Sequence, residues 1–122
     1  MRYALLALLL APACVSRQEV ARVPSPSGEL DAVVIETRAG AGTLPGYEVH
    51  LVERGAPLFT SSEVAYVYGA RRDPDGWGVS PRWRTPRLLA VEYASARDAQ
   101  LLSRYVTMAG QKIEIGLVPG AR

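Results

Sequence analysis

The sequence predicts a mainly β, β-rich fold: a single small antiparallel sheet or a sandwich of about five strands, with one short helix before the last strand. An α+β arrangement is therefore also open. Short runs of β-branched and apolar residues recur along the chain. The connections between them are rich in turn-forming residues, with 11 Gly and 9 Pro in 122 residues. Residues 28–122 have the length of one domain, so a single β-rich domain is expected there.

Three of the expected strands lie in the first part of this domain. Leu30–Arg38 contains a β-branched run, which is typical of a strand buried on both faces for part of its length. Tyr47–Arg54 alternates apolar and polar residues, so it is expected to be half-buried. Val64–Tyr68 follows a turn-rich segment and is the third expected strand.

Two further strands are expected toward the C-terminus. Arg87–Tyr93 is apolar along most of its length. Lys112–Val118 has the clearest alternation in the chain, which predicts that Ile113, Ile115 and Leu117 face the core while the residues between them face solvent.

A short helix is expected between these two strands. Ser95 and Asp98 form an S-x-x-D capping-box pattern, and Gly110 would close the segment. The apolar residues after the cap are spaced for one helical face, which predicts a helix from about Ala96 to Tyr105. These residues are Ala99, Leu101, Leu102, Tyr105 and Val106.

The first 13 residues have the features of an export signal peptide. Arg2 supplies a positive charge, and Ala4–Ala11 supplies a short apolar run. Ala11-Pro12-Ala13 places small residues where a signal peptidase cuts. The apolar run is too short for a membrane-spanning helix, which needs about 20 residues. We therefore expect the protein to work outside the cytoplasm, with residues 1–13 removed.

Cys14 leaves two processing alternatives. Signal peptidase could release a soluble periplasmic or secreted protein. Alternatively, Leu10–Cys14 resembles a bacterial lipobox, which implies a diacylglyceryl group on the Cys14 sulfur and a lipid-anchored protein of the cell envelope, on the periplasmic face. Cys14 is the single cysteine, and lipidation would protect a thiol without a partner in an oxidising compartment. The sequence therefore favours a lipoprotein with the membrane as partner, and residues 14–27 are expected to be a polar, proline-containing tether.

A turn-and-strand pattern carries a family resemblance. Ser25–Leu30 resembles the S-P-D-G-K strand opener of Tol-type β-propellers, and Trp83–Val91 is similar to a strand of their blades. A propeller needs at least four blades, which this chain cannot supply. The pattern over Ser25–Tyr93 is more similar to a family of small exported bacterial proteins of unknown function, although Ser27 stands where that family has aspartate. The resemblance implies a β-rich fold and no activity.

The charge balance excludes a strong general attraction to nucleic acid. The formal net charge is +2, and an exported protein does not meet nucleic acid as its usual partner. The basic residues are thirteen Arg and one Lys. A GC-rich genome explains this usage as composition, and the alternative is that guanidinium groups recognise phosphate or carboxylate. We expect no nucleic-acid partner and no cofactor.

No catalytic or metal-binding set is expected from the sequence. His50 is the single histidine, no G-x-S-x-G motif accompanies it, and it is expected to be exposed on a strand beside Glu48. One histidine and the distant Cys14 cannot supply the ligands of a zinc site. The Asp-Pro-Asp-Gly segment at residues 73–76 reads as a turn, because arginines occupy the first and last positions of a calcium-loop template.

Arginine and tryptophan residues gather between Gly69 and Thr85, which is expected to be a loop. Both residue types are enriched at binding hot spots. Trp77 lies between two glycines and is expected to be exposed, whereas Trp83 is expected to pack inside. The alternative is that the arginines only solvate the loop. The expected partner-binding residues are Arg71, Arg72, Trp77, Arg82 and Arg84.

These observations favour an exported cell-envelope lipoprotein domain that acts as a non-enzymatic binding or structural module. Its partner is expected to be an envelope protein or an anionic surface component. A secreted inhibitor-like module is the first alternative, and release of the protein into the medium would favour it. A small hydrolase that uses carboxylate groups is the second, and it would be favoured by two carboxylates that converge in a pocket.

Overall fold

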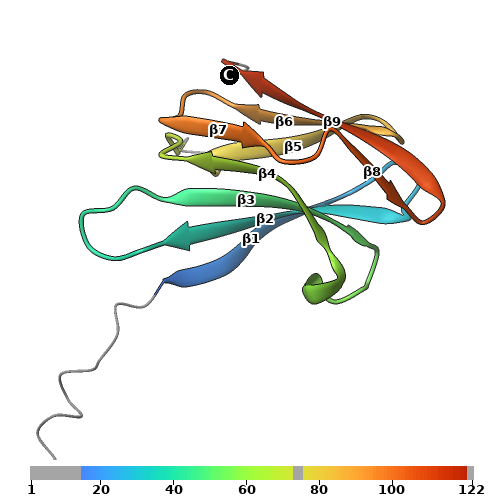
Figure 1. Cartoon of the computed structure of the whole chain (residues 1–122), viewed down its shortest axis with the longest axis horizontal. Coiled ribbons are helices and arrows are strands. Elements are labelled where there is room, and N and C mark those ends of the chain that lie inside the picture. Colours follow the sequence, from blue (N-terminus) through green and yellow to red (C-terminus); the bar gives the residue numbers. More distant parts are fainter. Residues whose placement is uncertain (1–14, 73–75, 121–122) are drawn as a thin grey trace, which may run out of the picture.

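The computed structural model describes residues 15–72 and 76–120, and within them two β-sheets pack face to face (Figure 1). The mainly β prediction is therefore confirmed. Sheet A has the order β1-β2-β3-β4-β7, and sheet B has the order β5-β6-β9-β8. Sheet A contains β1 (Ser16–Pro24), β2 (Leu30–Arg38), β3 (Gly46–Glu53), β4 (Ser62–Tyr68) and β7 (Asp98–Leu101). Sheet B contains β5 (Val79–Thr85), β6 (Leu88–Tyr93), β8 (Tyr105–Met108) and β9 (Gln111–Pro119).

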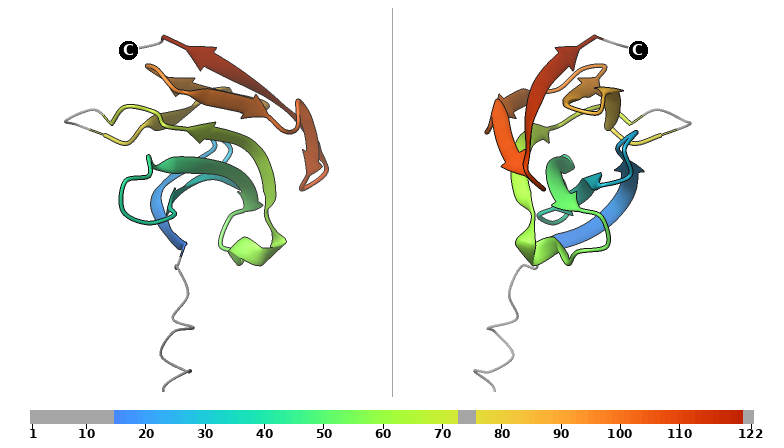
Figure 2. Two further views of the ribbon diagram at one scale, coloured as in Figure 1. Left: turned by 60° about the vertical axis from the view of Figure 1, so that its left-hand side comes forward. Right: turned by 90° about the vertical axis from the view of Figure 1, so that its right-hand side faces the viewer.

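The strand pairing differs in two respects from the prediction of about five antiparallel strands. Nine strands are present in the described residues, and β6 pairs with β9 in parallel while every other neighbouring pair is antiparallel. The parallel pair arises because the chain leaves sheet B after β6, adds β7 to sheet A, and returns to sheet B through β8. The chain therefore crosses between the sheets three times, after β4, after β6 and after β7 (Figure 2).

The core lies between the sheets and follows the alternation of the strands. Tyr47, Val49 and Leu51 of β3 are fully buried there, and Ile113 and Ile115 of β9 face them from sheet B. The prediction for β9 is thus confirmed at Ile113 and Ile115, and the half-buried Leu117 packs against the same cluster.

The turn between β1 and β2 has a local explanation. The Ser25 amide donates to the Leu30 carbonyl oxygen at 2.8 Å, and the Ser25 hydroxyl accepts from the Leu30 amide at 3.2 Å. Gly28 adopts a φ of 77°, which glycine tolerates without a steric penalty. The S-P-S-G sequence therefore closes an antiparallel pair.

The expected tether at residues 14–27 is wrong for its described part. Ser16–Pro24 forms β1, which pairs with β2 along its length, and Val20 and Ala21 pack against the core. Its polar composition belongs to an edge strand with one face in solvent, and its proline stands at the end of that strand, where a ladder donor is dispensable. Cys14 and the signal segment lie outside the described residues.

The expected helix at Ala96–Tyr105 is also wrong. This stretch forms β7 and the start of β8, and Arg97 donates its amide to the Tyr68 carbonyl oxygen at 2.9 Å just before β7 begins. A ten-residue helix is marginal by itself. Pairing with the free edge of β4 satisfies backbone groups of both segments, so tertiary pairing overrides the helical spacing. Among the described residues, no helix is long and apolar enough to cross a bilayer.

The connection between β3 and β4 covers part of the outer face of sheet A. It includes a short 3-10 helix, η2 (Leu58–Thr60), and lies on the side of sheet A away from sheet B (Figures 1 and 2). Leu58 and Ala56 pack there against a second, small apolar cluster formed by Val33, Ile35 and Val52. This connection brings η2 and Ser61 close to the polar residues of β3.

Candidate functional site

A groove opens at one side of the sandwich, between the edge strands β1 and β5. Its volume is about 620 Å³, and its apolar lining includes both tryptophans of the chain together with three prolines. These residues are Trp77, Trp83, Pro24, Pro26 and Pro81. We call this feature the edge groove.

The edge groove exists because β1 and β5 each pair on one side only. β1 pairs with β2 and β5 pairs with β6, so their other edges face each other across the gap between the sheets. The Trp83 indole bridges this gap, because its Nε1 donates to the Val23 carbonyl oxygen at 3.1 Å. Pro81 in the middle of β5 is compatible with an edge strand, since proline has no amide to donate to a ladder.

Trp77 does not stand free in solvent, contrary to the prediction from its flanking glycines. It is half-buried, packs against the core, and carries the Arg72 guanidinium 4.3 Å from its ring centroid. A β-carbon on Gly78 would lie 2.5 Å from a ring carbon of Tyr47. The backbone therefore lies close to the core at Gly78, and the neighbouring Trp77 lines the groove. Trp83 is half-buried as well, which agrees with its expected inward position.

Arg82 and Arg84 supply the polar rim of the edge groove. Arg82 Nε donates to Glu92 Oε1 at 3.0 Å, and Arg84 Nη2 donates to Glu92 Oε2 at 2.6 Å. Glu92 is buried, whereas both arginines are more than half exposed. Two guanidinium groups thus share one carboxylate, which leaves one unit of positive charge beside the tryptophans.

The expected binding residues are therefore brought together only in part. Trp77, Arg82 and Arg84 line the edge groove, and Arg72 reaches it through its contact with Trp77. Arg71 is exposed outside the lining, and its amide donates to the Ser95 carbonyl oxygen at 3.3 Å. The segment is not one loop, because its second half forms β5. Residues 73–75 of the expected turn lie outside the described residues.

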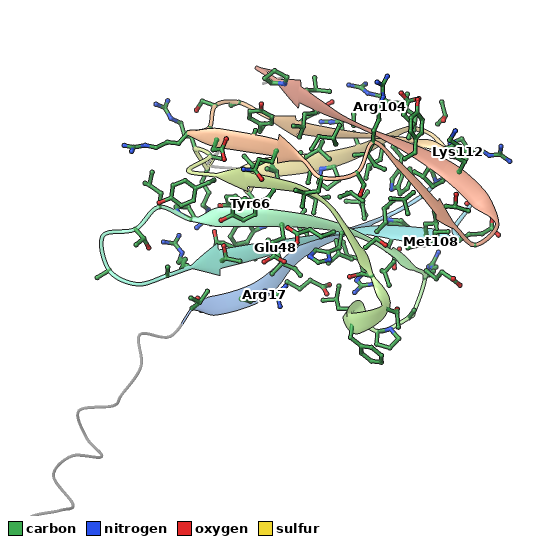
Figure 3. All side chains as sticks on the ribbon, in the orientation of Figure 1. Arg17, Glu48, Tyr66, Arg104, Met108 and Lys112 are labelled. Carbon is green, nitrogen blue, oxygen red and sulfur yellow. The ribbon has the colours of Figure 1, made fainter. Side chains whose placement is uncertain are left out.

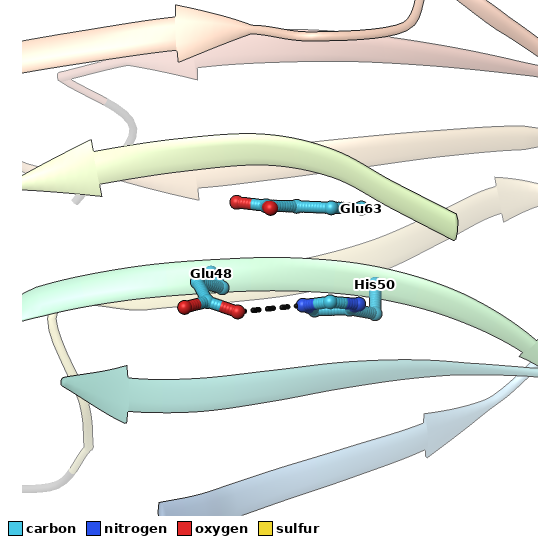
Figure 4. A group of neighbouring side chains, drawn as sticks. All are labelled: Glu48, His50 and Glu63. Carbon is cyan, nitrogen blue, oxygen red and sulfur yellow. Dashed lines mark hydrogen bonds and ion pairs between the residues drawn. The ribbon is translucent and has the colours of Figure 1, made fainter. Parts of the chain in front are cut away.

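A second polar site lies on the outer face of sheet A, and we call it the His50 cluster. His50 Nε2 lies 2.8 Å from Glu48 Oε1, and His50 Nδ1 lies 2.8 Å from Ser61 Oγ. The side chain of His50 is only 12% exposed, so the expectation of an exposed histidine is wrong. Figure 4 shows Glu63, on β4, beside the hydrogen-bonded pair formed by Glu48 and His50 on β3. Arg17 of β1 completes the cluster.

Arg17 holds Glu48 in place. Its Nη2 donates to Glu48 Oε1 at 2.6 Å and its Nε donates to Glu48 Oε2 at 3.2 Å. Burial by itself would raise the pKa of Glu48, but the hydrogen bonds from Arg17 and His50 outweigh burial and keep the pKa below its usual value. Figure 3 shows Arg17 and Glu48 on sheet A, on the opposite side of the molecule from Arg104 and Lys112.

Glu63 reaches this face through an irregularity in β4. The register between β3 and β4 shifts between Val49 and His50, so that Glu63 lies opposite His50 while Tyr66 lies opposite Glu48. A β-bulge of this kind re-aims side chains. Burial and the nearby charge of Glu48 raise the pKa of the Glu63 carboxyl.

The His50 cluster has the composition of a partial metal site but not its free ligands. Potential ligand atoms of Glu48, His50 and Glu63 lie within 4.8 Å of one another. Both oxygens of Glu48, however, are bonded to Arg17, and the Nε2 atom of His50 faces Glu48. A metal ion would have to displace these contacts beside a guanidinium charge, so we assign no metal ligands to this part of the chain.

Sequence reasoning missed Ser61, Glu63 and Arg17 as neighbours of His50. Alternation did place Glu48 and His50 on one face of β3. Ser61 and Glu63 come from beyond a turn and a β-bulge, and Arg17 comes from the segment expected to be a tether. No local spacing pattern encodes these three contacts.

Comparison of the chain with protein-family models, with curated proteins and with solved structures gave no match.

Proposed function

We propose that this protein is an exported cell-envelope lipoprotein whose domain binds an extended, acidic segment of an envelope protein in the edge groove. The observation that carries the proposal is the convergence of both tryptophans with Arg82 and Arg84 around one groove. Aromatic side chains and arginines provide most of the binding energy in many protein interfaces.

The shape and lining of the groove favour an extended peptide. Aromatic-lined grooves bind extended, proline-containing segments, and a free strand edge can hydrogen-bond to an added strand. The edge groove combines both features, since Trp77 and Trp83 line it and the edges of β1 and β5 border it. An apolar or proline residue of the partner would pack on the indole rings.

The charge of the rim favours an acidic partner. Arg82 and Arg84 share the single carboxylate of Glu92, and their exposed guanidinium groups retain donors that can bond a carboxylate. Attraction between such exposed charges acts over a Debye length, about 10 Å at 0.1 M salt. Binding should therefore weaken as salt is added.

The proposed anchor is a diacylglyceryl group on Cys14. Because β1 begins at Ser16, the domain would sit close to the membrane surface instead of a few nanometres above it. The edge groove lies near the other end of β1, about 25 Å along a nine-residue strand. Mass spectrometry of membrane-extracted protein should show the lipid mass on an N-terminal Cys14. An unmodified protein in the medium would instead favour the secreted inhibitor-like alternative.

Tryptophan fluorescence tests the groove directly, because both tryptophans of the chain line it. The probe is a peptide of alternating glutamate and proline, and the reference is the same peptide with glutamine in place of glutamate. We expect the acidic peptide to change the emission in a saturable and salt-sensitive manner, and the glutamine peptide to bind more weakly. No change with either peptide would contradict the proposed ligand.

A charge-balanced variant supplies the matched control. Replacing Arg82 or Arg84 without Glu92 would endanger folding, since a buried carboxylate would lose a partner. The triple variant Arg82→Gln/Arg84→Gln/Glu92→Gln removes the excess charge without leaving a buried ion unpaired, and it should bind the acidic peptide more weakly. Arg104→Gln removes one exposed charge directly before β8, at the opposite edge of sheet B from β5, and should bind like the parent protein.

Site-specific crosslinking in the native envelope extends the test to the natural partner. A photoreactive residue in place of Pro26 lies in the groove lining, and one in place of Arg104 serves as the reference position. We expect a protein adduct at position 26 that is absent at position 104 and is competed by the acidic peptide. An adduct with lipid or glycan would identify an anionic surface component instead.

A further inference from the structure

The His50 cluster contains a serine, a histidine and a carboxylate joined in series. Ser61 Oγ lies 2.8 Å from His50 Nδ1, and His50 Nε2 lies 2.8 Å from Glu48 Oε1. A nucleophile within hydrogen-bond reach of a base, with the base oriented by a third group, is the diagnostic arrangement of covalent catalysis. Such sets are recognised by geometry and not by their order in the chain.

We propose that Ser61, His50 and Glu48 form an acyl-transfer site that hydrolyses esters with an apolar acyl group. This activity is independent of the binding proposed for the edge groove. The edge groove is lined by the far end of β1 and by β5, whereas Ser61 and His50 lie on the outer face of sheet A.

The hydrogen bonds support one assignment of the protons. With the proton on Nε2, His50 donates to Glu48, and its Nδ1 accepts the proton of the Ser61 hydroxyl. The two ring nitrogens are exchanged relative to serine proteases, in which Nε2 faces the serine. Acid–base chemistry needs only that one nitrogen faces the nucleophile while the other is held, and Glu48 holds it because Arg17 fixes both of its carboxylate oxygens.

Ester hydrolysis at this site needs water as its only co-reactant. Ser61 Oγ attacks the ester carbonyl carbon while its proton passes to His50 Nδ1. The carbon–oxygen bond to the alcohol then breaks, and the alcohol leaves with that proton. Water attacks the acyl-serine with His50 again as base, which releases the acid and restores Ser61. Glu48 is a positioning residue that stabilises the His50 imidazolium formed during both acylation and deacylation. Glu63 adds a second nearby carboxylate.

A pocket beside Ser61 fits this substrate class. Its volume is about 370 Å³, and its lining combines the apolar side chains of Ile35, Leu58 and Phe59 with Arg17, His50 and Ser61. Phe59 is 89% exposed at the tip of η2, where an acyl chain can pack against it. The Arg17 guanidinium is the cation in this lining and can stabilise the negative charge that develops on the carbonyl oxygen.

Covalent labelling of the full chain tests the proposal. A fluorophosphonate reacts with an activated serine, and peptide mass spectrometry locates the adduct. We expect one adduct per chain on Ser61, hydrolysis of p-nitrophenyl butyrate, and loss of both in Ser61→Ala. Ser62→Ala is the matched control, since Ser62 is the adjacent serine, begins β4 opposite Leu51 of β3, and is half-buried like Ser61. It should behave like the parent protein.

Two further variants distinguish the role of His50 from that of Glu48. His50→Gln should slow labelling by about 10²–10⁴-fold, as expected for the loss of a general base. Glu48→Gln should lower kcat for the ester with little change in KM, because it acts on the imidazolium and not on the bound acyl group. Circular dichroism and thermal unfolding establish that each variant is folded.

Absence of labelling and hydrolysis above the Ser61→Ala background in folded parent protein would overturn this proposal. Equal activity in the parent and Ser61→Ala would also overturn it, since the chemistry would then lie elsewhere. Both outcomes leave the edge-groove proposal untouched, because tryptophan fluorescence reports peptide binding separately.

Discussion

Among individual residues, Tyr47 shows how one polar contact is accommodated in the core. Tyr47 is fully buried, and its hydroxyl donates to Glu36 Oε2 at 2.8 Å. Glu36 is buried as well, so this carboxylate depends on Tyr47, with Arg38 3.5 Å away on its other oxygen. Burying a carboxylate without hydrogen bonds costs free energy. The hydrogen bond between Tyr47 and Glu36 therefore stabilises the sandwich at the end where the connection between β2 and β3 lies.

Tyr47→Phe should lower the free energy of unfolding by about 1–3 kcal/mol, because the ring volume is kept while a buried acceptor loses its donor. Urea unfolding at pH 7 measures this difference. Tyr66→Phe is a comparison on the outer side of the neighbouring strand and should cost less. Equal losses in both variants would mean that the contact with Glu36 is not responsible.

The raised pKa of Tyr47 predicts that the free energy of unfolding depends on pH in the alkaline range. Burial, followed by the hydrogen bond to Glu36, raises the pKa of Tyr47 to about 12. The unfolded chain has a tyrosine pKa of about 10. The folded state therefore binds the Tyr47 proton more tightly than the unfolded chain does. The resulting stabilisation of the folded state is complete below pH 10 and is lost as the pH rises toward 12. The difference in unfolding free energy between parent protein and Tyr47→Phe should shrink over that interval. A constant difference would contradict the raised pKa.

At the scale of the element, β9 illustrates alternation that local sequence encodes fully. Ile113 and Ile115 are buried, while the side chain of Glu114 between them is 45% exposed. β9 is also central in sheet B, with β6 on one side and β8 on the other. Its inward residues therefore meet the core from a strand that is held on both edges.

Ile115→Ala should lower the free energy of unfolding by about 2–5 kcal/mol, through lost burial and the cavity that remains. Glu114→Ala should change it by less than about 0.5 kcal/mol, as is usual for exposed positions. Denaturant unfolding of the two variants compares adjacent positions of one strand. Similar losses at both would contradict the half-buried assignment of β9.

For the whole molecule, β1 connects the N-terminal segment, the edge groove and the His50 cluster. It contributes Arg17 to the cluster and Val23 to the groove, although these lie near opposite ends of the strand. A free tether would carry neither contact. Stability and both proposed sites therefore depend on a segment that composition by itself assigns to a linker.

Truncation of the chain tests whether residues 16–24 act as a structural strand or as a tether. A chain that begins at Ser16 should unfold like the parent protein, whereas a chain that begins at Ser25 loses β1 and exposes the edge of β2. We expect the shorter chain to lose a large part of its stability or to show no cooperative transition in urea. The same transition midpoint for both chains would show that β1 is dispensable for folding.

The sequence by itself determined the β-rich class, the β1–β2 turn, and the inward faces of β3 and β9. These features are local: side chains alternate with a period of two along a strand, and serine, proline and glycine favour a particular turn. Leu30–Arg38 was predicted with the bounds that β2 has in the structure, and the bounds of the other four expected strands were close.

Only the tertiary structure decided which segments pair with the free edges of the strands and which distant residues meet. Residues 98–101 became β7 because β4 offered a free edge, and this pairing outweighed a helical spacing of apolar residues. Trp83 and Val23 meet across 60 residues of sequence, and Ser61 meets His50 only because the chain between them folds over sheet A. Such contacts depend on loop closure and strand pairing between distant segments. No short window of sequence contains both partners of the Trp83–Val23 contact, and the window that holds Ser61 and His50 does not encode the fold that joins them.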